Sequence, residues 1–259
     1  MLTRKTILAI LLLAAASFRL SAQSGPGGYQ YADRTSDIRA RASIAFDAKL
    51  MRGMHLTIEE QGRFKDGMSS FDRIDSDVAV SFKVLPFLKA ETGYTFIWEP
   101  LDIRHRTYAS LTGHFKTGQW NFSLKEKVQC THLTKEFNEY QQPRNGLCLK
   151  SRVKVSYKCF AKPFEPYAFC ELRTRLNGAQ YTDYLDPSTM SYSDTFNDRL
   201  RFGLGSEWRL DRNNFLEFYV LTDKIDSKKV DAKKNGELKT ITFMPAVNLT
   251  LGAAWRFKL

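Results

Sequence analysis

The last thirteen residues of the chain, VNLTLGAAWRFKL, alternate between apolar side chains and polar or small ones. A period of two residues places each set on one face of a β-strand. The alternation recurs in segments 38–50, 74–84, 88–98, 120–128, 147–158 and 200–210, and no comparable stretch has a helical period. The sequence therefore predicts an all-β protein. The apolar set at the C-terminus is Val247, Leu249, Leu251, Ala253, Trp255, Phe257 and Leu259.

The faces opposite the apolar sets carry several full charges on each strand. In a soluble sandwich such faces would meet water, which is the alternative interpretation, but soluble strands are usually only about five or six residues long. Short turns also alternate with longer links, as in outer-membrane barrels. Lipid satisfies no backbone polar group, so the sheet must close. We predict a closed antiparallel transmembrane β-barrel. Its predicted turns are 51–53, 85–87, 117–119, 161–163 and 211–213, and its longer links are 65–70, 99–104, 133–145, 177–197 and 226–237.

The number of strands raises a question of parity. The turns and links separate eleven strands, of which the first and the last run toward the short turns. Closing such a barrel would pair two parallel strands. Bacterial single-chain barrels are even-numbered, so we expect a short extra strand around 28–34 and about twelve strands, within a range of ten to twelve. Aromatic residues near strand ends form a predicted membrane-anchoring girdle: Trp98, Trp120, Trp208, Trp255 and Phe257.

The first 22 residues have the features of a secretory signal peptide. Arg4 and Lys5 precede an apolar run at 7–16, and small residues end the segment at Ala22. Residues 23–259 then form the barrel domain, and removal of three basic residues lowers the formal net charge from +11 to +8. A basic chain can bind nucleic acid, but export and the strand spacing of the basic residues argue against it. We expect the protein to be located in the outer membrane of a Gram-negative bacterium.

Four stretches resemble one family of exported bacterial proteins. They are HLTIEEQGRFKDGMSSFDRIDSDVAVSFKVLPFLKAETGYTFI, WNFSLKEKVQCTHL, LKSRVKVSYKCFAKPFEPYAFCEL and RLRFGLGSEWRLDRNNFLEFYVL. The family is domain of unknown function 2490, common in Bacteroidetes, and the resemblance extends over residues 37–259. It implies an outer-membrane barrel and brings no assigned activity, so no functional residue is carried over.

A lumen-lining basic wall is the densest chemical feature of the chain. One interpretation is a narrow, anion-preferring transport path, because low-dielectric walls focus the field of such charges. The other is a structural barrel whose lumen is plugged by ion pairs with Asp75, Asp77, Glu91 and Glu171, since a twelve-stranded barrel is narrow. The predicted wall consists of Lys150, Arg152, Lys154, Arg173, Arg175, Arg199 and Arg201.

The alternative function is a lipid-modifying, phospholipase-like enzyme at the outer rim. His132 faces lipid near that rim, where outer-membrane phospholipases keep a His and a Ser nucleophile in a His-x-Ser spacing. Here Thr134 stands at the serine position. We therefore expect no catalytic residue. His55, His105 and His114 have no metal-binding spacing, and we expect neither a metal nor a cofactor.

Cys130 and Cys148 flank the predicted outer loop. In a hairpin centred near position 139 they would lie opposite one another, and a disulfide there would constrain the loop. Cys159 and Cys170 are offset across their turn, and we expect them to be unpaired.

The loop at 177–197 is rich in Asp and Tyr. It can be interpreted as a ligand-binding or calcium-ordered loop, or as an ordinary solvated loop. The expected partners are outer-membrane lipid and lipopolysaccharide, and small anionic solutes if the lumen is a path. The C-terminal strand also resembles the sorting signal read by the barrel insertion machinery.

Overall fold

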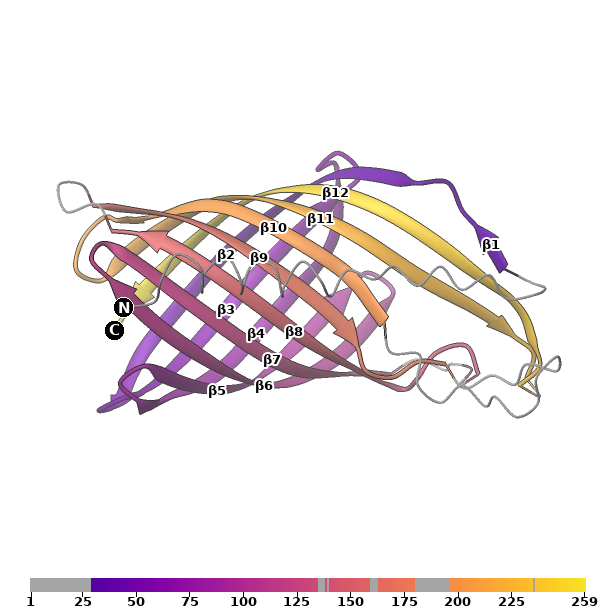
Figure 1. Cartoon of the computed structure of the whole chain (residues 1–259), viewed down its shortest axis with the longest axis horizontal. Helices are drawn as coiled ribbons and strands as arrows, with labels where there is room; N and C mark the ends of the chain where they lie inside the picture. Colours follow the sequence, from indigo (N-terminus) through magenta and orange to yellow (C-terminus); the bar gives the residue numbers. More distant parts are fainter. Residues whose placement is uncertain (1–28, 135–137, 139, 159–162, 180–195, 235) are drawn as a thin grey trace, which may run out of the picture.

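The computed structural model describes residues 29–134, 138, 140–158, 163–179, 196–234 and 236–259 (Figure 1). The predicted signal peptide lies outside these residues. Within them, no helix is long and apolar enough to span a membrane. The strands are β1 (Tyr29–Tyr31), β2 (Thr35–Met51), β3 (Met54–Lys65), β4 (Ser70–Leu85), β5 (Leu88–Glu99), β6 (Asp102–Thr117), β7 (Trp120–Leu133), β8 (Asn145–Tyr157), β9 (Phe164–Arg175), β10 (Phe196–Arg209), β11 (Asn214–Ala232) and β12 (Leu238–Lys258).

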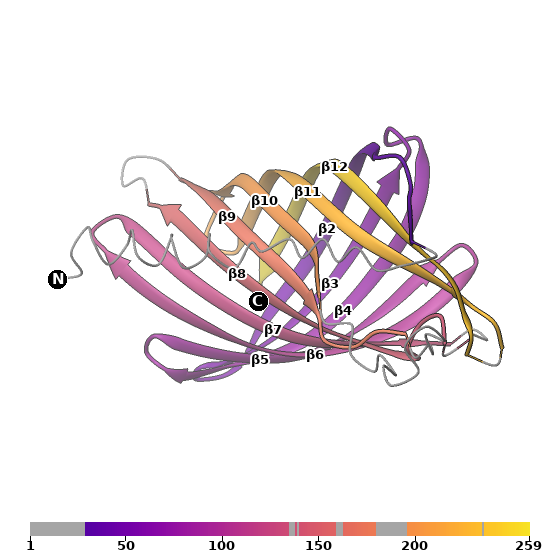
Figure 2. The same cartoon turned by 45° about the vertical axis from the view of Figure 1, so that its right-hand side comes forward.

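Strands β2 to β12 form a closed barrel in which every consecutive pair is antiparallel. The barrel closes between β12 and β2, which run parallel over residues 246–258 and 35–47. The described residues contain twelve strands, but the expected even-numbered closure is wrong, because eleven of these strands form the barrel. The extra strand β1 lies on the same edge of β12, also parallel, and pairs with residues 241–243 (Figures 1 and 2). The chain continues from β1 into β2 without reversing, so no antiparallel twelfth strand forms.

The barrel is apolar outside and polar inside. Phe46 and Leu251 on the outer face are each 42% exposed, whereas Glu171 on the inner face is 3% exposed. Apolar side chains that face outward from a closed sheet are what a lipid environment requires. The predicted alternation therefore has the correct phase, and the protein is a transmembrane barrel.

The two rims differ as predicted, although two links are shorter than expected. Four of the predicted short turns, at 51–53, 85–87, 117–119 and 211–213, lie at one rim, and the fifth, at 161–163, falls mostly outside the described residues. Gly53 (φ +81°) permits the two-residue turn between β2 and β3. At the other rim, only residues 100–101 separate β5 from β6, and the predicted link at 226–237 is mostly strand. Ser227, Lys228 and Lys229 pair with β12 beyond the apolar band.

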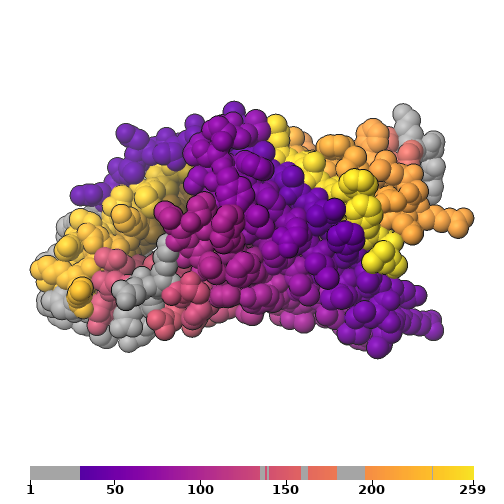
Figure 3. All heavy atoms as spheres, turned by 180° about the vertical axis from the view of Figure 1, so that it is seen from behind, coloured from indigo at the N-terminus to yellow at the C-terminus, as the bar shows by residue number. Residues whose placement is uncertain are grey.

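The long β11–β12 hairpin carries a small apolar cluster at the rim of the longer links. Its buried residues are Val230, Ala232 and Ile241 of the hairpin and Ala179, which follows β9, and Tyr140 from the β7–β8 connection packs against them. Gln141 from the same connection donates hydrogen bonds to Asp231 and to the carbonyl of Ala232. In Figure 3 the β11–β12 hairpin and the β7–β8 connection lie together at one end of the molecule.

Candidate functional site

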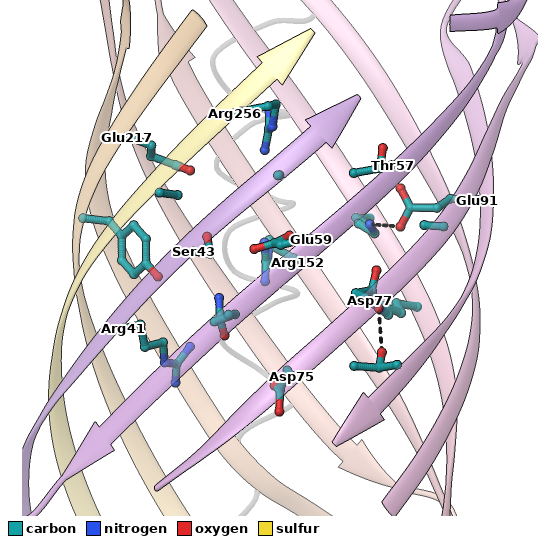
Figure 4. Close-up of a pocket in the computed structure, with 18 of the residues that line it drawn as sticks. Arg41, Ser43, Thr57, Glu59, Asp75, Asp77, Glu91, Arg152, Glu217 and Arg256 are labelled. Atoms are coloured by element: carbon teal, nitrogen blue, oxygen red, sulfur yellow. Dashed lines mark hydrogen bonds and ion pairs between the residues drawn. The ribbon is translucent and has the colours of Figure 1, made fainter. Parts of the chain in front are cut away.

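The lumen contains a cavity of about 510 Å³ lined mainly by charged side chains. Figure 4 shows these side chains, including Arg41, Glu59 and Arg152, pointing inward from opposite sides of the barrel. Ten Lys and Arg side chains and seven Asp and Glu side chains line it, so its formal charge is positive. A second cavity of about 440 Å³ lies toward the short turns. Asp47 and Lys89 line both cavities.

One row of inward side chains crosses five neighbouring strands and is held by ion pairs. We call it the paired row: Lys125, Arg152, Glu171, Arg201 and Asp223, each the register partner of the next. The Arg201 guanidinium donates to both Asp223 oxygens at 2.7 and 3.1 Å and to Glu171 at 3.3 Å. Arg152 Nε donates to Glu171 at 2.7 Å, and Lys125 pairs with Glu91 at 2.8 Å. Every charge in the paired row has an opposite charge beside it.

A second row lies two residues along the same strands and contains only cations. We call it the basic row: Lys127, Lys150, Arg173 and Arg199, again consecutive register partners. Arg173 pairs with Asp198, which also accepts from Arg175. No ion pair within the described residues includes the other three cations. The Nε of Arg199 is buried and has no hydrogen-bond partner there.

Further cations, on β2, β3, β4 and β6, also face the lumen, and the predicted wall did not include them. Arg63 and Arg73 face each other across β3 and β4 and share Asp75. Arg41 lies 3.9 Å from Asp223, and Arg106 donates to the Thr131 hydroxyl at 3.2 Å. The alternation of the sequence places all four side chains inward. They were missed because these strands carry only one or two inward cations each, with acidic residues beside them. The basic residues therefore surround the lumen.

Aromatic rings on the inner face lie flat against the barrel wall. A Cβ at Gly252 would overlap the ring of Tyr219, and one at Gly203 would overlap Phe169. The absence of a side chain at these positions lets the rings approach the backbone instead of pointing across the lumen. Tyr108 lies in the same way over Gly93, and Tyr167 over Gly205.

Three lumen cations lie over these rings. Lys127 Nζ is 3.2 Å from the centre of the Tyr108 ring, and Lys154 Nζ is 3.7 Å from that of Tyr167. The Arg152 guanidinium lies 4.7 Å from the centre of Phe169. Cation–π contacts of this kind hold a cation without neutralising it.

The predicted basic wall is divided by the structure into different settings. Lys150, Arg152 and Arg201 line the cavity, and Lys154 lies over Tyr167. Arg173 and Arg175 share Asp198, which lies on β10 just after the loop at 177–197. Residues 180–195 of that loop lie outside the described residues.

The residues of the predicted girdle face outward. Trp98 is near the long-link end of β5, whereas the others lie near the short turns. Their role as membrane anchors stays a prediction. The exposed fractions are 42% for Trp98, 49% for Trp120, 47% for Trp208 and 44% for Trp255, and Phe257 stacks on Trp255 and Phe46.

A family model described as "Protein of unknown function (DUF2490)" matches residues 41–234. The chain belongs to the DUF2490 family. This confirms the resemblance noted in the sequence. No curated protein matches the DUF2490 chain.

Among solved structures, the DUF2490 chain is similar to one described as "NanC porin structure in rhombohedral crystal form". The two are 12% identical, the match covers 73% of this chain and 87% of that one, and the TM-score is 0.44. The function of the DUF2490 chain is therefore inferred from its own residues.

The predicted disulfide of the DUF2490 chain is wrong. Cys148 pairs in register with Gln129 and faces inward, whereas Cys130 pairs with Leu147 and faces outward. The hairpin is centred half a residue from the expected position, which puts the two thiols on opposite faces. Cys130, Cys148 and Cys170 are free, and Cys159 lies outside the described residues.

The structure does not bring together His132 and Thr134, the two residues on which the enzyme alternative rests. His132 Nδ1 lies 2.8 Å from Asn145 Oδ1. The Thr134 hydroxyl donates instead to the carbonyl of Ile103. Each side chain thus has its own partner, and neither contact links the imidazole to the hydroxyl as nucleophile activation requires.

Proposed function

We propose that the protein provides a narrow path for small anions across the outer membrane. The observation that carries the proposal is the excess of cations around the lumen cavity, of which Lys127 and Lys150 form no ion pair within the described residues. Rings of Arg and Lys favour anions in other pores. Low-dielectric walls strengthen the field of such charges inside the lumen.

The outer membrane is the compartment that suits this barrel. Its apolar outer face needs lipid, and the predicted signal peptide would export the chain. We further propose that lipid and lipopolysaccharide surround the outer face. The insertion machinery would recognise the C-terminal strand, where Trp255, Phe257 and Leu259 lie on the apolar face.

The path would run past the aromatic rings that lie against the wall. Those rings leave the centre of the lumen to the cavity, and Lys127 and Lys154 lie over two of them. Lys127 and Lys150 form no ion pair within the described residues, so both would be available to an anion in the cavity. The shared lining of the two cavities extends the path toward the short-turn rim.

The second candidate is a structural barrel with a closed lumen. The paired row favours it, because Arg201 joins Glu171 to Asp223 across β9, β10 and β11. Buried ion pairs of this kind fix side chains in place. In this case the barrel would serve as a scaffold for its outer connections and would carry no current.

Planar-bilayer recording separates the two candidates. We expect the wild-type protein to conduct with anion preference, and the double variant Lys127→Glu with Lys150→Glu to conduct with cation preference. The control is Lys49→Glu with Lys234→Glu, which changes charge equally at exposed positions outside the cavity. Its preference should match that of the wild type. A folded wild-type protein without current would contradict the path and support the scaffold.

A further inference from the structure

The basic row is energetically unusual for a folded sheet. Like charges directly opposite on neighbouring strands are destabilising, yet three successive register pairs in this row are basic on both sides. Asp198 neutralises part of the charge at Arg173. The other three cations form no ion pair within the described residues, and the buried Arg199 Nε has no hydrogen-bond acceptor there.

The spacing of the row defines the shape of its counter-charge. Neighbouring strands lie about 4.8 Å apart, so four strands span about 14 Å. The cations are thus spaced about 5 Å apart along one line. A single small anion can reach one or two of them, whereas a linear molecule with repeated anionic groups can contact all four.

The direction of the row also suits a path. Barrel strands tilt by about 35–45° from the barrel axis, so a row perpendicular to the strands climbs along the lumen. Lys127 and Lys150 line the cavity. Arg173 and Arg199 lie close to the long-link ends of β9 and β10. The row therefore joins the outer mouth of the lumen to its cavity.

We propose that the basic row is a binding site for a linear polyanion, with its anionic groups about 5 Å apart and held across β7, β8, β9 and β10. This rests on the proposed function in that the lumen must be accessible to anions. The recognised chemistry is a series of phosphate or carboxylate groups on one chain. The adjacent paired row forms a rigid wall beside the site, because its cations are held in ion pairs with carboxylates.

Calorimetric titration of the folded full-length protein in detergent tests the site. The probes are inorganic tripolyphosphate and the tripeptide triglutamate, which distinguish phosphate from carboxylate ligands, with orthophosphate as the single-group reference. We expect at least one of the two linear probes to bind at least about tenfold more tightly than orthophosphate, because it would form additional charge-assisted contacts.

The decisive variant is Lys150→Gln with Arg199→Gln. We expect it to weaken binding of that linear probe by at least about tenfold, because two charged contacts are removed. The matched control is Lys89→Gln with Lys154→Gln, which removes two inward cations outside the basic row. It should retain binding within about threefold of the wild type, because both row cations remain. Heat-modifiable migration on a gel verifies that each variant is folded.

The outcomes separate this site from the proposed function. Equal weakening in both double variants, or no preference for linear probes over orthophosphate, would overturn the site. A protein that conducts anions but shows no such binding keeps the path and loses the site. Binding that depends on the basic row, in a protein without current, keeps the site and removes the path.

Discussion

The paired row and the basic row occupy the same face of the same strands, two residues apart, and differ in how their charges are compensated. In the paired row, Arg201 lies between two carboxylates and is only 7% exposed. In the basic row, Lys150 has cations as register partners on both sides. Because geometry and strands are shared, the difference is one of composition alone. We infer that the paired row holds the barrel together and the basic row serves anions.

The largest expected effect comes from breaking the paired row. Replacing Arg201 by Ala leaves Glu171 and Asp223 without their shared cation inside the barrel. Removal of one partner of a buried pair typically costs about 3–5 kcal/mol. We expect the free energy of unfolding in detergent to fall by about that amount, as measured by urea titration. A loss below about 1 kcal/mol, typical of surface ion pairs, would mean that this row is not structural.

The next effect tests the outer face against the lumen. An Arg at Leu251, on the lipid side, should cost about 2–4 kcal/mol near the membrane midplane. An Arg at Ser43, which lines the cavity together with Glu59, should cost clearly less because a carboxylate and water are available. Folding titrations in lipid vesicles measure both. Equal costs would contradict the assignment of the two faces.

A smaller effect is expected at the aromatic wall. Alanine at Gly203 would force the Phe169 ring away from the backbone and toward the lumen. Overpacking of this kind costs about 1–3 kcal/mol. We expect lower single-channel conductance and a modestly lower unfolding free energy. Unchanged conductance in a folded Gly203→Ala variant would indicate that the ring does not border the path.

The smallest effect has the opposite sign. Replacing Lys150 by Gln removes repulsion from Lys127 and Arg173, so stability should rise by about 0.2–1 kcal/mol. The same replacement at Lys125 should lower stability, because Glu91 loses its partner at 2.8 Å. Urea titration of the two single variants measures the difference. Destabilisation by Lys150→Gln would reveal a structural role for that cation.

Much of the fold could be predicted from the sequence because a period of two residues fixes which face meets lipid. The outward stripe ending at Leu259 and the four short turns within the described residues were predicted in this way. Register could not be predicted, because it depends on how the connection between β7 and β8 folds. A slip of one residue was enough to place Cys130 and Cys148 on opposite faces.

The candidate site was predictable only in part for the same reason. Inward cations on β8, β9 and β10 are visible as alternate residues in the sequence. Whether Lys150 lies opposite Arg173 or opposite Glu171 depends on a register of two residues, and that register decides between a basic row and a paired one. The count of turns and links did indicate a parallel closure, which β2 and β12 form, but the rule that bacterial barrels are even-numbered favoured a twelfth strand instead.

The most direct test of the anion path is the reversal potential of the wild-type protein across a tenfold KCl gradient, recorded at low and at high mean salt. The Debye length falls from about 30 Å at 0.01 M to about 3 Å at 1 M, so salt should screen the lumen cations. We predict a reversal potential of the sign for chloride preference, large at low salt and smaller at high salt. A potential of the sign for potassium preference, or one that salt does not change, would contradict a path governed by the basic lumen.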